Sequence, residues 1–93
     1  MRVLGTTILE EFQHDHADVR SWISAWLAEV KDAEWTTPQD IKNRYQSASF
    51  LSDRLVIFNV KGTKYRMVCK ISFQFNIVRV QWAGTHAEYS KRY

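Results

Sequence analysis

The sequence predicts an α+β domain in which helices pack on one face of an antiparallel sheet. Hydrophobic periodicity is helical in the first half of the chain and changes to a period of two after Phe50, an order that favours segregated helices and strands. The chain has 93 residues, of which 45% are hydrophobic and 25% charged. These values are typical of a soluble globular protein, and the length allows only one core. Residues 1–93 are therefore interpreted as a single domain.

The first elements are a short strand and a helix. Residues 1–6 contain enough apolar and β-branched residues for a brief strand. Thr7 and Glu10 have the spacing of a capping box, which predicts that Thr7 caps a helix. Residues 15–18, which include two Asp and one His, are expected to interrupt or restart this helix.

Two further helices are indicated before the period changes. Apolar residues recur at helical spacing between Val19 and Val30, and we interpret this stripe, with its two Trp residues, as core rather than as a ligand site. A shorter helix is expected after Thr37, with Thr37 as the N-cap, Pro38 at the first helical position and Asp40 in the first turn.

The second half alternates as strands do. Strands are expected at 55–60, 65–73 and 77–82, with a Gly-containing connection at 61–64, a turn at 74–76 and a closing helix at 85–92. Alternation places Lys64, Arg66 and Lys70 on the face opposite the core, where Arg79 joins them from the next strand. The same alternation places Val78, Val80 and Trp82 together on one face.

Charge is divided unevenly along the chain. Residues 1–53 contain five basic and nine acidic residues, a net of −4, whereas residues 54–93 contain eight basic residues and one acid, a net of +7. The sum is the net charge of +3. A basic half of this kind indicates a surface that binds a polyanion. The alternative is a solvated face whose long side chains cover apolar surface.

The closing segment adds groups that suit RNA cleavage. A histidine exchanges a proton near neutral pH and a tyrosine offers a hydroxyl, so His86 and Tyr89 are candidates for proton transfer, with the acid and base roles left open. Lys91 and Arg92 add charge. Cleavage of an RNA backbone needs a base for the 2′-OH, an acid for the leaving 5′ oxygen, and cations for the charge on phosphorus.

Several other classes of function are disfavoured. The single Cys69 cannot form an intramolecular disulfide, no Cys/His spacing is typical of a zinc site, and His14 and His16 do not share a helix face. We expect no metal or other cofactor. No apolar run approaches the roughly 20 residues that span a bilayer, and no leader is evident, so a cytoplasmic protein without membrane contact is expected.

Two motifs in the second half resemble a known family. Residues 58–68 read FNVKGTKYRMV, and residues 85–89 read THAEY after an alternating strand. Together they resemble the HigB toxins of bacterial type II toxin–antitoxin systems, in the RelE-like superfamily, over nearly the whole chain.

The resemblance implies a RelE-like fold and a cytoplasmic mRNA interferase that cuts messages on the ribosome. It also implies a HigA-like helix-turn-helix antitoxin as partner, with operator DNA bound only through the antitoxin complex. Two departures from the family pattern bear on activity: Thr63 stands where Asn is usual and Ser90 where Asp is usual.

Roles can be assigned within this hypothesis. Arg66 and Arg79 are expected to clamp the scissile phosphate, and His86 or Tyr89 to transfer protons. Asn59 is interpreted as structural, an inward amide that holds the hairpin, and Arg66 has the alternative of pairing with Glu88. The competing functions are a non-catalytic RNA- or ribosome-binding module and a degenerate toxin that acts only through its antitoxin. The remaining expected RNA contacts are Lys61, Lys64, Lys70, Lys91 and Arg92.

Overall fold

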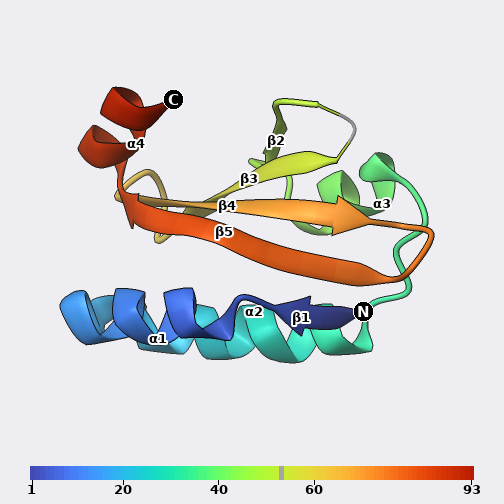
Figure 1. Ribbon diagram of the computed structural model, residues 1–93, viewed down its shortest axis with the longest axis horizontal. Helices are drawn as coiled ribbons and strands as arrows, with labels where there is room; N and C mark the ends of the chain where they lie inside the picture. The colour runs from blue at the N-terminus through green and yellow to red at the C-terminus, as the bar shows by residue number, and fades with distance from the viewer. Residues whose placement is uncertain (53) are drawn as a thin grey trace.

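The computed structural model describes residues 1–52 and 54–93. Figure 1 shows two N-terminal helices below a twisted sheet and a C-terminal helix beyond the end of the sheet, on its other side. The helices and strands, in chain order, are β1 (Arg2–Leu4), α1 (Thr6–Asp15), the 3₁₀ helix η1 (Ala17–Val19), α2 (Arg20–Asp32), α3 (Pro38–Arg44), β2 (Ser49–Phe50), β3 (Leu55–Val60), β4 (Tyr65–Ser72), β5 (Ile77–Thr85) and α4 (His86–Arg92).

Within the described residues the sheet has five strands, in the order β1-β5-β4-β3-β2. Neighbouring strands are antiparallel except for β1 and β5, which are parallel. Parallel neighbours need a long connection, and the chain between β1 and β5 includes the helices α1 to α3. The predicted α+β class is confirmed. The short β2 was not anticipated from the sequence, since two residues carry no periodic signal.

The core lies between the sheet and the layer of α1 and α2. Leu9 and Phe12 of α1, together with Ile23 and Trp26 of α2, are almost fully buried against it. The helical stripe predicted from the sequence is therefore core, and the interruption predicted at residues 15–18 is the end of α1 and the start of η1. No helix in the described part of the chain is long and apolar enough to cross a membrane.

The start of α1 differs from the prediction. Gly5, with φ 81°, is the N-cap, and no side chain caps the helix, so the capping box expected at Thr7 and Glu10 does not form. A Cβ on Gly5 would lie 2.3 Å from the Val80 carbonyl oxygen. The chain must turn sharply from β1 against the backbone of β5, and only glycine fits that turn.

A bulge in β5 corrects the predicted face of Trp82. The register pairs Cys69 with Val80 but Val68 with Trp82, so Gln81 is an extra residue. The insertion changes the parity of alternation, as β-bulges do. Val80 faces the core, whereas Trp82 shares the opposite face with Val68.

The two described helices that have Thr as the N-cap, α3 and α4, each have a complete capping box. In α3 the predicted N-cap is confirmed, with Thr37 and Asp40 bonding reciprocally and Pro38 at the first position. In α4 the pair is Thr85 and Glu88. Thr85 and Glu88 of the THAEY motif thus serve to cap the helix. The side chains of this motif that remain as candidates for proton transfer are those of His86 and Tyr89.

Candidate functional site

Arg66 is the centre of the candidate site. It lies on β4 on the face opposite the core, and its guanidinium carbon stands 4.6 Å from the centroid of the Tyr89 ring. The side chain is half-buried rather than fully exposed. Its Nε atom is buried without a hydrogen-bond partner, and no ion pair among residues 1–52 and 54–93 includes it. The protein therefore leaves the charge of Arg66 available to an anion.

Glu88 does not neutralise Arg66. One of its carboxylate oxygens accepts the Thr85 backbone N–H at 2.9 Å, and the Glu88 N–H donates to the Thr85 hydroxyl at 3.2 Å. The hydrogen bond from the Thr85 backbone, the largest cause, lowers the pKa of Glu88. The alternative pairing of Arg66 with Glu88 is thus not the arrangement in this structure.

Helix α4 presents the proton-transfer candidates. The backbone N–H of His86 donates to the Lys64 carbonyl at 3.2 Å, which attaches the helix to the turn between β3 and β4. His86 is the first residue of the helix and is exposed, and Tyr89 follows on the same side one turn later. The Ser90 hydroxyl donates to the His86 carbonyl at 3.1 Å, so Ser90 supports the helix rather than either side chain.

The Tyr89 ring, on which Arg66 lies, belongs to a cluster of three aromatic rings, and the other two members were not predicted from the sequence. Tyr89 and Tyr93 are stacked with centroids 5.2 Å apart, and Trp82 lies 6.2 Å from Tyr89 and 6.0 Å from Tyr93. Trp82 reaches this cluster because the bulge turns it away from the core. Gly84 makes room for it, since a Cβ there would lie 2.8 Å from the Trp82 ring.

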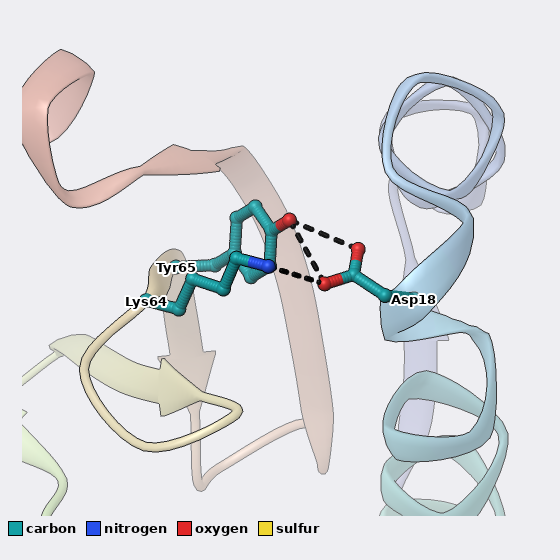
Figure 2. A network of polar contacts seen from close by, with 3 residues as sticks. All are labelled: Asp18, Lys64 and Tyr65. Carbon is teal, nitrogen blue, oxygen red and sulfur yellow. Dashed lines mark hydrogen bonds and ion pairs between the residues drawn. The ribbon is translucent and has the colours of Figure 1, made fainter.

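Lys64 does not join the face on which Arg66 lies. Its ammonium is 2.9 Å from a carboxylate oxygen of Asp18, and the Tyr65 hydroxyl donates to both oxygens of Asp18, at 2.9 and 3.1 Å (Figure 2). The pKa of Asp18 is lowered mainly by the hydrogen bond from Lys64 and further by the hydrogen bond from Tyr65. Lys64 precedes β4 in the turn, where strand alternation does not apply, so the prediction of its face was wrong.

This network also changes the interpretation of the segment at the end of α1. It ties η1 to the β3–β4 turn, and that turn accepts the first N–H of α4. The ring of His16 lies 4.8 Å from that of Tyr65 and 5.5 Å from that of Phe12. Asp18, which is exposed, and His16, which is half-buried, thus connect the end of α1 to the hairpin of β3 and β4.

The predicted site residues fall into two groups. Arg66 and Tyr89 are in contact, and the others near them are exposed: Lys61 in the turn, with φ 53°, and His86, Lys91 and Arg92 on α4. Lys70 is four residues from Arg66 along β4, a separation of about 13 Å at the rise of a strand. Arg79 lies directly opposite Lys70 on β5. Asn59 donates to the Ser47 carbonyl at 3.2 Å and so anchors the segment before β2, not the hairpin.

Fold and surface together define a small α+β protein of RelE-like architecture with a cationic and aromatic site at one end of its sheet. The family model of the RelE-like toxic component of a toxin–antitoxin system matches residues 19–92. This match covers most of the chain, and the protein therefore belongs to the HigB toxin family. It is a toxin of a toxin–antitoxin system, and the family implies an antitoxin partner. No curated protein matches the chain.

Proposed function

We propose that this toxin is an endoribonuclease that cuts messenger RNA during translation, with Arg66 as its phosphate-binding residue. The observation that carries the proposal is the guanidinium of Arg66, stacked on Tyr89 and without a carboxylate partner in the described chain. A fixed and uncompensated guanidinium is suited to the charge that develops on a phosphoryl group. The alternative, a module that only binds RNA or ribosomes, becomes an outcome of the test below.

The proposed reaction is attack by the 2′ oxygen on the adjacent phosphorus. A base takes the 2′-OH proton, the O2′–P bond forms, the P–O5′ bond breaks, and an acid protonates the 5′ oxygen. The products are a 2′,3′-cyclic phosphate and a 5′-hydroxyl. His86 and Tyr89, one helical turn apart, are the proposed proton-transfer pair, in either order.

The other cations are proposed to bind the strand on either side of the cut. Lys61, Lys91 and Arg92 lie around the turn and α4, near Arg66. Because the register places Arg79 opposite Lys70, we assign Arg79 to a neighbouring part of the strand along with Lys70. A contact between Lys64 and RNA competes with Asp18 for the same ammonium.

Dependence on the ribosome is proposed from the openness of the site. Helix α4 has no buried residue and His86 is exposed, so the protein alone has little to hold a flexible strand in line for attack. A partner that positions the message supplies that order, and the translating ribosome is the proposed partner. The cognate partner that blocks the site is proposed to be a helix-turn-helix antitoxin, and the compartment the cytoplasm.

Mapping of 5′ ends tests the proposal. A translated reporter and an untranslated copy are compared after brief induction of the wild type, Arg66→Ala and Arg66→Lys, with Arg20→Ala as a matched control on the exposed surface of α2. New ends inside the reading frame should appear with the wild type and Arg20→Ala. They should fall by about 100-fold or more with Arg66→Ala, the effect of losing a transition-state donor.

Other outcomes would contradict parts of the proposal. Growth inhibition with no new ends would indicate the binding module. Equal cleavage of the untranslated copy would exclude dependence on translation. Full cleavage by a folded Arg66→Ala protein would remove Arg66 from the reaction.

A further inference from the structure

A second cationic and aromatic surface lies at the other end of the sheet from Arg66. It surrounds a pocket of about 420 Å³, formed by the segment just before β3, the end of β4 and the turn between β4 and β5. This volume is within the range of about 300–1,000 Å³ found for ligand pockets. The side chains that matter here are two cations, Arg54 and Lys70, and two aromatic residues, Phe73 and Phe75.

The turn between β4 and β5 exposes the side chain of Phe75 to solvent. It is 68% exposed, the most exposed of the large apolar side chains described. Its backbone N–H donates to the Ser72 hydroxyl at 3.2 Å, and the next residue, Asn76, has φ 55° and accepts the Arg2 N–H at 2.7 Å. The turn is thus attached to both neighbouring strands while its aromatic ring faces solvent, an arrangement that folding alone does not favour.

The charge around Phe75 has one sign. Lys70 and Arg79 are directly opposed on β4 and β5, and the Arg54 carbonyl accepts the Ile71 N–H at 2.7 Å, which fixes Arg54 beside β4. No carboxylate from residues 1–52 or 54–93 lines the pocket. The two ion pairs within these residues lie elsewhere and include neither Arg54 nor Lys70. Like charges placed opposite one another repel, so the surface is suited to an anion.

We propose that this pocket is a binding subsite for one nucleotide of a single-stranded RNA, separate from the cleavage site. Phe75 stacks on the base, and Arg54 and Lys70 bind the flanking phosphates. Single strands are recognised by this combination of a cationic groove and an exposed aromatic ring. An acidic protein segment would pair with the cations but has no nucleobase to stack on the Phe75 ring. RNA is therefore the favoured ligand. The inference rests on the proposed function in that the same strand continues along β4 to Arg66.

Binding of an uncleavable 2′-deoxy oligonucleotide tests the subsite, because it lacks the attacking 2′-OH. Fluorescence anisotropy compares the wild type, Phe75→Ala, Phe75→Tyr, and Leu51→Ala, which truncates another large apolar residue that is 51% exposed. Phe75→Ala should weaken binding by at least about fivefold. Phe75→Tyr and Leu51→Ala should bind as the wild type does. Urea unfolding of Phe75→Ala should match the wild type, since the ring is exposed.

The outcomes separate this inference from the proposed function. Weaker binding by Phe75→Ala supports the subsite even if 5′-end mapping detects no cleavage. Wild-type affinity in a folded Phe75→Ala protein overturns the subsite even if Arg66-dependent cleavage is found. If Phe75→Ala binds the oligonucleotide normally but loses affinity for the cognate antitoxin, the pocket is a protein-docking surface and the RNA assignment is wrong.

Discussion

At the scale of single residues, the glycine before α1 shows how a local backbone requirement is imposed by the sheet. Gly5 and Gly62 both have positive φ, 81° and 70°, but only Gly5 would bring a Cβ against backbone, whereas Gly62 has open space. Gly62→Ala should lower the free energy of unfolding by about 1–2 kcal/mol, the cost of left-handed backbone. Gly5→Ala should cost more than that, because the Val80 carbonyl of β5 cannot move. Urea denaturation of the two variants measures the difference, and equal losses would contradict the clash.

The two functions of Tyr89 can also be separated at this scale. Tyr89→Phe keeps the ring beneath Arg66 and removes only the hydroxyl, whereas Tyr89→Ala removes both. If the hydroxyl transfers a proton, Tyr89→Phe should lower the cleavage rate by about 100-fold or more. The measurement is the yield of 5′ ends on translated reporter mRNA. A Tyr89→Phe protein with wild-type cleavage would assign proton transfer to another group and leave Tyr89 as a support for Arg66.

At the scale of elements, the two capped helices form a natural comparison. Thr37 and Thr85 make the same capping box, but α3 buries Ile41 in the core whereas α4 buries nothing. Thr37→Val should reduce global stability by about 1 kcal/mol, the usual cost of a lost cap, and leave cleavage unchanged. Thr85→Val should loosen α4 and lower cleavage with little effect on the urea midpoint. A reversed pattern would mean that α4 is not the element that presents the site.

The same scale shows what the sequence could and could not predict. Elements with repeated periodicity were predictable, as the helical stripe of α2 and the alternation of β4 demonstrate. The bulge at Gln81 was not, because one inserted residue leaves no mark on composition but moves Trp82 to the other face. The contact of Asp18 with Lys64 was not predictable either, since 46 residues separate them and only the packing of η1 beside the hairpin joins them.

At the scale of the whole molecule, the acidic half of the chain contains helices α1 to α3, and the basic half contains strands β3 to β5 and helix α4. The residues up to 53, which include the helical layer, have a net charge of −4, and those from 54 onward, which form β3 to β5 and α4, have +7. This separation orients the molecule toward a polyanion before contact, an effect that salt screens. Binding of a single-stranded oligonucleotide should therefore weaken steeply as salt rises. Replacing both Arg54 and Lys70 by Ala should reduce the log–log slope by about 1.4, the value for two phosphate contacts at 0.7 each.

The pH dependence of stability is also a property of the whole molecule. On the acid side, hydrogen bonds in the fold lower the pKa of four carboxyls among residues 1–52 and 54–93. The unfolded chain therefore takes up protons first, and stability is lost as pH falls below about 4.5. Urea midpoints at pH 6.5 and 3.5 measure this loss, which should be smaller in Asp18→Asn. A midpoint that did not fall would contradict the prediction. The four carboxyls are those of Asp18, Glu29, Asp40 and Glu88.

The alkaline side has the opposite sign and a different cause. Burial raises the pKa of the Cys69 thiol and, as the largest contribution, those of the Tyr45 and Tyr65 hydroxyls. These groups keep their protons in the fold but lose them in the unfolded chain, beginning near pH 8.5 for cysteine and 10 for tyrosine. Stability is therefore complete below those values and decreases as pH rises through them. Urea midpoints at pH 7 and 10 should show the decrease. Cys69→Ala should have a shallower decrease than the wild type, because it removes the group that titrates first. An identical decrease would contradict this prediction and assign the alkaline loss to groups other than Cys69.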